Sequence, residues 1–591
     1  MKKNTILLLV SLGLMFFGSL FAGLVQSGFG TIKVRDVQIY TDGGAILGGT
    51  LLVPKGVSAE NPAPGIVTIH GYLNSRGMQT SFSTEFARRG YVVLNIDMFG
   101  HGTSGTENPD TDASVPAVRY LNSLAFVDSN NIGVEGHSKG GFSATLGALR
   151  LPPGSVKSVL AIGSGLTWLA YTGLEFPVDM PVNYGTIYGS YDDFGWLMWS
   201  EAHTDHKNVP HYANYSPQMV TAFGVAESVE PFTWYGSKAA NTQRIFYQVP
   251  EIHTKNHISN LSAGYAMNFM NATLSGGNKA GLADSNMIWY WKEILTTISM
   301  LAMFVFLFAL GNWLLSVGQN SAYTSVPAPG KAAFNIRFWI MLVIGAALPA
   351  LTYFSFMNAG EKILKLSRLF PQPTSSAVGF WAFINGLLTL ALLIIVYRIF
   401  GKKEGVQVSE WGFKAPAKNI LRQVLLGFAT VFGAYLLLCA ANFFFHVDFR
   451  SFVIGFMPLT LSKFQALCAY FVFFAVFALC NALALNASYR FTDGSFLKTA
   501  IFSILANVCG MVVLIIIGYG GMRILGYLPF KSTGWSLRII QAMSFLVFLP
   551  LAALLNTWFY KKTGSIYMGA TITALILAFA TVGNTAMDFL F

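Results

Sequence analysis

Long apolar runs dominate the chain from about residue 286 onward and limit what it can fold into. A helix of about 20 apolar residues crosses the roughly 30 Å of hydrocarbon in a membrane. Eight such runs are expected, over 294–317, 338–357, 377–400, 423–445, 464–485, 499–522, 539–560 and 567–590. With only 11% charged residues and a mean hydropathy of +0.51, the chain is too apolar for a soluble globular protein. The region 276–591 is therefore predicted to be an all-α membrane domain with about eight transmembrane helices.

A further apolar run covers residues 6–25 and follows Lys2 and Lys3. A cleaved signal sequence usually has a shorter apolar core and a cleavage site of small residues. The long run favours a retained transmembrane anchor over residues 1–30, with a signal sequence as the alternative. Either interpretation places the next domain on the extracytoplasmic side. The excess of Lys and Arg in the loops expected on the side of the N-terminus supports that orientation and a multi-pass integral membrane protein.

Residues 31–275 carry the pattern of a domain that alternates strands and helices. The segments 32–40 and 45–53 alternate apolar and polar residues around a turn at Asp42, which predicts a β-hairpin. Short apolar runs bounded by glycine follow at 65–70, 91–97, 132–135, 156–163, 183–188 and 244–249, with helix-like stretches at 80–89 and 115–124. Strands that alternate with helices predict a mostly parallel sheet covered by helices on both faces.

Charge and cysteine content exclude several classes of function. The net charge is +11, but many basic residues flank the apolar runs and no basic cluster is interleaved with aromatics, so the expected partner is the lipid bilayer and not nucleic acid. All four cysteines lie in the apolar half of the chain: Cys439, Cys468, Cys480 and Cys509. The domain over 31–275 therefore has no disulfide, no thiolate nucleophile and no cysteine-based metal site.

The strongest chemical signal is a G-x-S-x-G motif that runs from Gly136 through His137, Ser138 and Lys139 to Gly140. It follows the apolar strand at 132–135 and precedes a helix-like run of small residues. A tight turn between strand and helix holds such a serine in a strained conformation, and the glycines relieve crowding there. Ser138 is therefore the predicted nucleophile.

A second turn lies upstream, where the strand at 65–70 ends in His70, Gly71 and Tyr72. A turn at this position can present a backbone N–H to a developing oxyanion. We predict that the N–H groups of Tyr72 and Lys139 form the oxyanion hole. The glycine-containing segment 97–104 is interpreted as a structural turn near the site, in which His101 makes local hydrogen bonds.

The order of these motifs resembles the α/β-hydrolase superfamily, and within it the dienelactone-hydrolase-like and serine-esterase members. The resemblance covers roughly residues 33–275 and implies an α/β-hydrolase fold. Members of the dienelactone type use cysteine as nucleophile, whereas this chain has Ser138, so the resemblance implies chemistry of the esterase type. It also implies a triad in the order serine, acid, histidine, with the acid after a late strand and the histidine after the last one.

The resemblance places the acid after the strand at 183–188 and the base after the strand at 244–249. Asp192 has the family's Gly-x-x-Asp spacing, and Asp193 is the alternative. His253 comes directly after its strand and is preferred, with His257 as the alternative. The acid would hold the imidazole in the correct tautomer and stabilise the imidazolium.

Two weaker signals receive simpler interpretations. A group of acidic and histidine residues is read as a solvated loop and not as a metal site: Glu201, His203, Asp205, His206 and His211. Asparagines within the apolar runs are expected to form hydrogen bonds between helices: Asn385, Asn442, Asn481, Asn507 and Asn556.

The sequence thus predicts a membrane-bound serine hydrolase. It would cleave an ester, thioester or lactone of a small-molecule or lipidic acyl compound through an acyl-Ser138 intermediate, with no metal or organic cofactor. One alternative is a transporter or lipid-handling protein whose hydrolase-like outer domain binds or modifies cargo. Another is a serine peptidase or acyltransferase that uses the same triad. The oligomeric state and the role of the membrane domain stay open.

Overall fold

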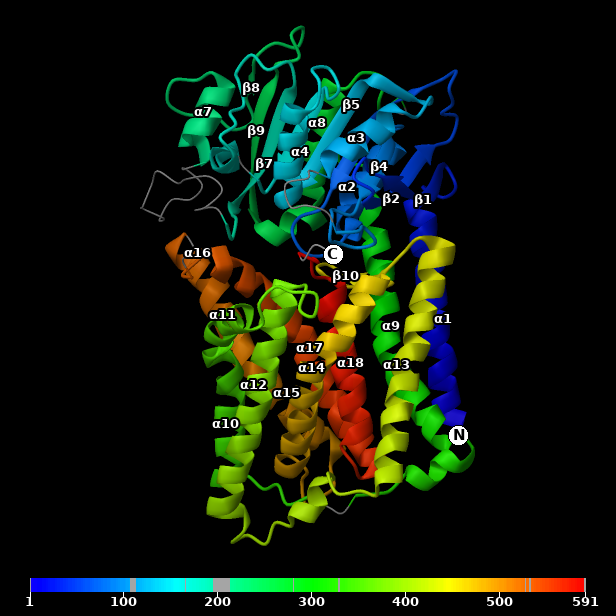
Figure 1. Ribbon diagram of the computed structural model, residues 1–591, viewed down its shortest axis with the longest axis vertical. Helices are drawn as coiled ribbons and strands as arrows, with labels where there is room; N and C mark the ends of the chain where they lie inside the picture. The colour runs from blue at the N-terminus through cyan, green and yellow to red at the C-terminus, as the bar shows by residue number, and fades with distance from the viewer. Residues whose placement is uncertain are drawn as a thin grey trace.

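The protein has two parts, a sheet-containing domain and a bundle of long helices beneath it (Figure 1). The computed structural model describes residues 2–106, 113–164, 166–194, 213–279, 281–327, 330–526, 528–530 and 533–588. The N-terminus lies at the end of the bundle that is far from the sheet. The segment that follows the last helix lies at the junction of the two parts.

A nine-stranded sheet forms the centre of the upper domain, in the order β1-β2-β4-β3-β5-β6-β7-β9-β8. The strands are β1 (Ile32–Tyr40), β2 (Ile46–Pro54), β3 (Ala63–Ile69), β4 (Val92–Ile96), β5 (Val127–His137), β6 (Ser158–Ile162), β7 (Asn183–Tyr191), β8 (Trp234–Tyr235) and β9 (Arg244–Ile252). β1 and β2 form the expected antiparallel hairpin. Six neighbouring strands of the sheet run parallel to one another, in the order β4, β3, β5, β6, β7 and β9. This order, with antiparallel β2 beside β4, is that of the α/β-hydrolase fold, which confirms the predicted fold class.

Helices cover both faces of the sheet, because each face is apolar. α3 (Ser114–Asn122) and α4 (Lys139–Arg150) bury their apolar residues in one core. α2 (Thr80–Arg88) and α8 (Asn260–Thr273) form a second core on the other face. The chain after α8 still contacts this domain, since the Glu85 carboxylate accepts the backbone N–H groups of Ile288 and Trp289.

Long apolar helices form the lower domain: α9 (Trp289–Ser316), α10 (Ile336–Leu351), α11 (Tyr353–Ile363), α12 (Pro373–Val396), α13 (Ala417–Phe445), α14 (Leu461–Ser488), α15 (Phe496–Ile515), α16 (Gly521–Leu525), α17 (Thr533–Thr563) and α18 (Tyr567–Gly583). A short hairpin of β10 (Phe449–Ser451) and β11 (Ile454–Phe456) joins α13 to α14. Among the described residues, and with the N-terminal helix α1 (Lys2–Gln26) included, seven helices are long and apolar enough to cross a membrane. They are compatible with a multi-pass membrane protein.

Two of the predicted spans differ from the structure. The run at 338–357 is broken into α10 and α11, which are bent by 52° at Thr352. Pro349 lacks the N–H of a regular helix, and its carbonyl oxygen accepts the indole N–H of Trp381, which stabilises the bend. The run at 567–590 contains only the 17 residues of α18, about 26 Å of helix, because the chain turns into the junction after Gly583.

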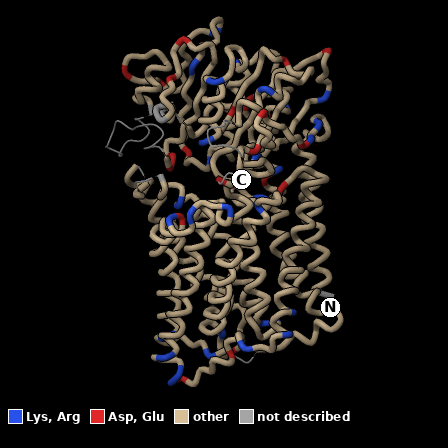
Figure 2. Tube along the Cα trace, in the orientation of Figure 1, with Lys and Arg blue, Asp and Glu red and all other residues tan. Residues whose placement is uncertain are grey.

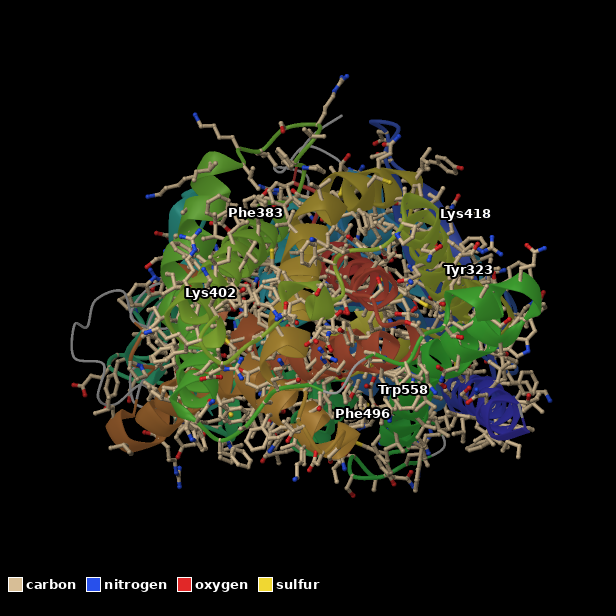
Figure 3. The ribbon with its side chains drawn as sticks, turned by 90° about the horizontal axis from the view of Figure 1, so that it is seen from below. Tyr323, Phe383, Lys402, Lys418, Phe496 and Trp558 are labelled. Atoms are coloured by element: carbon tan, nitrogen blue, oxygen red, sulfur yellow. The ribbon has the colours of Figure 1, made fainter. Side chains whose placement is uncertain are left out.

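Charged residues avoid the middle of the bundle and gather at its two ends (Figure 2). The loops predicted to share a side with the N-terminus do lie at one end of the bundle, as the view from below shows for Lys402 and Lys418 (Figure 3). α1 packs along α9, where the Ser299 hydroxyl lies 3.5 Å from the carbonyl oxygen of Met15. This packing favours a retained anchor, which stays a prediction.

Four of the five asparagines that the sequence predicted to join helices do so, whereas Asn442 bonds to the loop that follows its own helix. Asn481 on α14 accepts from Asn556 on α17 and donates to Asn507 on α15, at 3.1 Å and 2.8 Å. Asn385 on α12 bonds to Thr352 at the break between α10 and α11. Asn442, at the end of α13, donates to Asp448 in the loop that follows. These amides bind one another or nearby polar groups, so they stabilise the bundle.

Candidate active site

Ser138 occupies a sharp turn between β5 and α4. Its φ is 55° and its ψ is −121°, a left-handed backbone conformation that is strained for a residue with a Cβ atom. A Cβ atom at Gly136 would lie 2.2 Å from the carbonyl oxygen of Gly140, and one at Gly140 would lie 2.3 Å from that of Ile69. The turn therefore requires glycine on both sides of the serine, as in the nucleophile elbow of α/β hydrolases.

An acid and an imidazole meet next to this turn. The Nδ1 atom of His253, which directly follows β9, lies 2.8 Å from a carboxylate oxygen of Asp192, which directly follows β7. Both side chains are buried. Ser138 and His253 line the same cavity, and the His253 ring lies beside the ring of His137 at a centroid distance of 4.6 Å. With Nδ1 held by the acid, the other ring nitrogen is left to serve as a base.

The two alternative residues make different contacts. A carboxylate oxygen of Asp193 accepts the backbone N–H of His253 at 3.1 Å. His257 packs against the ring of His137 at 3.5 Å between centroids, and its carbonyl oxygen accepts the hydroxyl of Ser81. Neither alternative takes part in the acid–imidazole pair. The pairing thus favours Asp192 and His253, whose catalytic roles remain predictions.

The pKa values of the three histidines beside Ser138, which are His137, His253 and His257, are shifted in different directions. Burial alone would lower the pKa of His253, but the charge of Asp192 and its hydrogen bond outweigh burial and raise that pKa above 6.5. Burial and the neighbouring histidines hold the pKa values of His137 and His257 well below 6.5. Burial and the charge of Asp192 raise the pKa of Asp193 to about 6. His253 is thus the member of this group that binds a proton most readily.

The loop after β3 lies against Ser138, since a Cβ atom at Gly71 would be 3.1 Å from that of the serine. His70 donates from Nδ1 to the Gly71 carbonyl oxygen at 2.6 Å and accepts the Met98 N–H at Nε2. His101 accepts the N–H of Leu73 at 3.2 Å, so it makes the local hydrogen bonds that the sequence suggested. Tyr72 and Lys139 both line the cavity with Ser138. The roles of their N–H groups as an oxyanion hole stay predictions.

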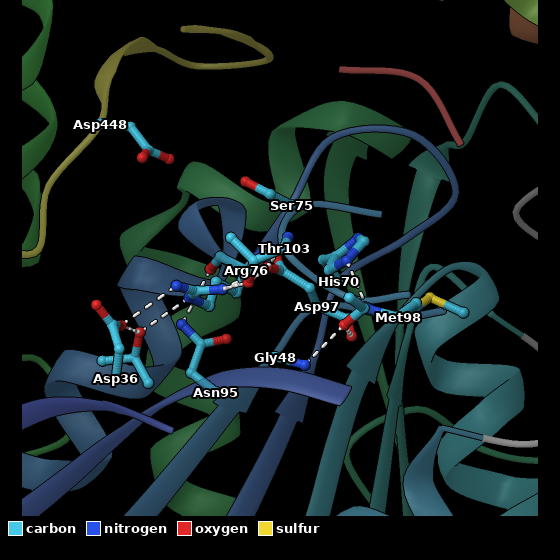
Figure 4. Close-up of polar contacts among 12 residues, drawn as sticks. Asp36, Gly48, His70, Ser75, Arg76, Asn95, Asp97, Met98, Thr103 and Asp448 are labelled. Atoms are coloured by element: carbon cyan, nitrogen blue, oxygen red, sulfur yellow. Dashed lines mark hydrogen bonds and ion pairs between the residues drawn. The ribbon is translucent and has the colours of Figure 1, made fainter. Parts of the chain in front are cut away.

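A network around Arg76 fixes the other end of this loop (Figure 4). The guanidinium bonds to the buried carboxylate of Asp97 and, at 3.2 Å, to Asp36 on β1. Asp97 also accepts the backbone N–H groups of Arg76 and Thr103 at 2.7 Å and 2.9 Å. The segment 97–104 is therefore a structural turn that supports the loop beside the serine.

The helical domain contributes residues to the site that the sequence analysis missed. The backbone N–H of Asn74 donates to the carbonyl oxygen of Asn584 at 2.6 Å, and its side chain donates to that of Val453 at 2.7 Å. The buried guanidinium of Arg450 donates to Asn74 and, at 2.9 Å, to the hydroxyl of Ser75. The loop beside Ser138 is thus held from below by two separate segments of the helical domain.

The loop that carries the acid is anchored in the same way. Arg523 donates to the hydroxyl of Tyr191 and lies over its ring at 5.3 Å. Ser536, at the start of α17, donates to the carbonyl oxygen of Asp193 at 2.8 Å. In the sequence, Arg450 and Arg523 are basic residues near the ends of apolar runs, and no pattern in a single sequence indicates that they contact the loops beside Ser138 and Asp192.

A cavity of about 480 Å³ opens at Ser138 and extends down into the helical domain. Its upper wall contains Ser138, His253, Tyr72 and Lys139, and its lower wall is formed by α12, α14, α17 and α18. This volume falls in the range of about 300–1,000 Å³ that is common for sites of small organic molecules. The arrangement can place a reacting carbonyl at the serine and an apolar group among the helices.

The segment 201–211, interpreted from the sequence as a solvated loop and not as a metal site, lies outside the described residues. Within the described residues, no group of three or more His, Cys, Asp and Glu side chains is placed to hold a metal ion.

No family model and no curated protein matches this chain. The chain is 20% identical to DcsB, solved in complex with its substrate analogue, over 23% of this chain and 46% of DcsB, with a TM-score of 0.20. It thus spans about half the length of that protein. A dienelactone hydrolase-like promiscuous phosphotriesterase from metagenomic libraries is 14% identical over 42% of this chain and 100% of its own, with a TM-score of 0.28.

Acetyl xylan esterase 1 from Thermoanaerobacterium sp. is 15% identical over 41% of this chain and 83% of its own, with a TM-score of 0.27. Likenesses of this size carry no argument about activity. The fold assignment rests instead on the strand order of the sheet and on the turn at Ser138.

Proposed function

We propose that this protein is a membrane-bound serine hydrolase that cleaves a carboxylic ester, thioester or lactone through an acyl-Ser138 intermediate. The observation that carries the proposal is the 2.8 Å contact between His253 and Asp192 beside a serine in a strained turn, with Ser138 and His253 lining one cavity. A strained serine, an acid-bound imidazole and a shared cavity are the parts that acyl transfer to a serine requires.

The proposed reaction assigns one role to each group. Ser138 Oγ attacks the carbonyl carbon while Nε2 of His253 takes its proton, and Asp192 stabilises the imidazolium through Nδ1. The N–H groups of Tyr72 and Lys139 donate to the oxyanion. When the bond to the leaving group breaks, His253 returns the proton to that group. Water then releases the acyl group by the same steps in reverse order.

The structure favours this hydrolase over the transport alternative. Buried asparagines, the main candidates for a polar path through the bundle, bind one another or nearby helix atoms. Ester, thioester or lactone cleavage is also preferred over peptide cleavage, because the part of the cavity that lies among the helices is mostly apolar and peptide backbones need polar partners. We further propose that the hydrolase domain is extracytoplasmic, since the N-terminal end of the bundle carries more Lys and Arg than the opposite end.

Covalent labelling tests the function directly. A fluorophosphonate should label the full-length protein in detergent at a single residue, Ser138, and intact-mass and peptide mass spectrometry would detect the adduct. Ser138→Ala should abolish the labelling, whereas Ser143→Ala, in the buried part of α4, should retain it. Labelling that persists in Ser138→Ala would refute the assignment of the nucleophile.

The pH dependence of the labelling rate follows from the pKa of His253. This imidazole must be neutral to accept the serine proton, and Asp192 raises its pKa above 6.5. The rate should therefore fall as the pH decreases through a value above 6.5. In Asp192→Asn the imidazole loses the charge that holds its proton, so the inflection should move to lower pH. An inflection that stays in place would show that another group controls the rate.

A further inference from the structure

The cavity beneath Ser138 has a polar mouth and an apolar floor. Asn584, Thr585 and Thr374 lie near its mouth, at the ends of α18 and α12 that face the sheet-containing domain. Farther from the serine, its walls are formed by Trp381 on α12, Phe477 on α14, Leu549 on α17 and Leu577 on α18. Gln541 and Ser544 on α17 also line the cavity, between Leu537 and Leu549, and the rest of the wall among the helices is mostly apolar. A mostly apolar cavity that is polar toward its mouth matches a molecule with a polar group at one end of an apolar chain.

The helices set the length of this cavity. Its wall on α17 runs from Leu537, beside the loops that carry the triad, to Leu549. These positions are twelve residues apart, which corresponds to about 18 Å along a helix. A linear alkyl chain with C–C bonds near 1.5 Å advances about 1.3 Å per carbon, so about fourteen carbons fit this length.

We infer that the acyl group of the substrate is a linear fatty-acyl chain that lies inside the helical domain during the reaction. This inference rests on the proposed function and names its substrate class: esters or thioesters of unbranched acids with about ten to fourteen carbons. The helical domain is then the acyl-binding half of the enzyme, in addition to holding the catalytic loops.

In this arrangement each bond that forms at the acyl carbon replaces one that breaks. The bond from Ser138 Oγ to the acyl carbon forms as the bond from that carbon to the leaving oxygen or sulfur breaks. The serine proton passes through His253 to the leaving group. The acyl chain stays among the helices, while the leaving group departs from the side of the sheet-containing domain. Water then gives a proton to His253 and attacks the same carbon; the bond from that carbon to Ser138 Oγ breaks, Oγ takes the proton, and the fatty acid is released.

Burial of the chain drives its binding. Each methylene moved from water into an apolar site contributes favourably, so affinity should rise with chain length until the floor is reached. Longer chains should then lose activity, because the extra carbons meet Trp381 and Phe477 in a packed bundle.

A pair of cavity-filling variants tests this inference with p-nitrophenyl esters of butyrate, octanoate and dodecanoate. Ala580 lies one turn from the end of α18 that faces the serine, and Ala382 lies about two and a half turns into α12. Ala580→Trp should lower kcat/KM for octanoate and dodecanoate by about tenfold or more relative to butyrate. Ala382→Trp should lower it for dodecanoate and leave octanoate close to wild type.

Ala429→Trp is the matched control, because Ala429 is exposed on α13 and does not line the cavity. The substrates partition into the same detergent in both assays, so the chain-length profile of this variant should equal that of the wild type. An unchanged profile in both cavity variants, with butyrate still cleaved at Ser138, would overturn the inference and leave the proposed function intact. Absence of serine labelling by any fluorophosphonate would instead overturn the proposed function.

A second measurement needs no variant. A dodecyl fluorophosphonate with a diazirine at the far end of its chain is bound to Ser138 of the wild-type protein and then irradiated. Peptide mapping should find the cross-link on α12, α14, α17 or α18, near residues such as Ala382 and Leu549. Cross-links confined to the sheet-containing domain would show that the chain binds elsewhere.

Discussion

Replacing His253 with alanine should lower kcat/KM by on the order of a hundred-thousandfold, because loss of the general base disables a serine triad as a unit. Of the three histidines that line the cavity with Ser138, His253 is the one whose Nδ1 atom binds a carboxylate, at 2.8 Å from Asp192. The fluorophosphonate labelling rate should fall in parallel. Both are measured with the full-length protein in detergent, and the circular dichroism spectrum serves as the check on folding.

His257→Ala is the matched control for this prediction. His257 is equally buried, but its neighbours are the ring of His137 and the hydroxyl of Ser81. Its loss leaves a small void and should reduce stability by about 1–3 kcal/mol while kcat/KM changes by less than about tenfold. If His257→Ala is the inactive variant, the base has been assigned to the wrong histidine.

Asp192→Asn should lower kcat/KM by about ten-thousandfold, since an amide in this position favours the wrong imidazole tautomer. One carboxylate oxygen of Asp192 accepts the backbone N–H of Phe194 at 2.8 Å, and the other faces His253. The asparagine oxygen would keep the first bond, so its NH₂ group would face the Nδ1 atom of His253. Nδ1 would then have to accept a hydrogen bond instead of donating one, so the ring N–H would lie on Nε2, which could no longer act as a base.

Asp193→Asn is the matched control for Asp192→Asn, because it makes the same replacement of a carboxylate oxygen by an NH₂ group. Asp193 accepts the backbone N–H of His253, and an amide oxygen accepts that bond equally well. The variant should keep kcat/KM within about tenfold of the wild type. A large loss in Asp193→Asn with a small one in Asp192→Asn would exchange the two roles.

Much of the fold could be predicted from the sequence because local residue patterns determine many of its elements. Alternating apolar and polar residues mark the hairpin of β1 and β2, and the glycines around Ser138 mark the turn between β5 and α4. The resemblance to α/β hydrolases, applied to the residues that follow the last two long strands, was enough to nominate Asp192 and His253. These signals are local, or depend only on the order of elements along the chain.

The remaining features depend on contacts between distant segments. The hydropathy of the run at 338–357 predicts an apolar helix, but the bend at Thr352 also depends on Trp381 from another helix. Arg450 reads as one more basic residue near a span end, yet it is buried against Asn74 and Ser75. The cavity below the serine involves four helices, and no single run of residues indicates a space between them.

The contacts of the loop beside Ser138 also order events during synthesis. Tyr72 emerges early from the ribosome, but its hydroxyl pairs with Asp588, a residue made 516 positions later. The backbone N–H of Asn74 likewise pairs with the carbonyl oxygen of Asn584, which is also synthesised late. A nascent chain would carry its serine, acid and imidazole long before this loop gained its last partners. Such a delay would leave the loop beside Ser138 without these partners until residues 584–588 had been synthesised and the helical domain had assembled.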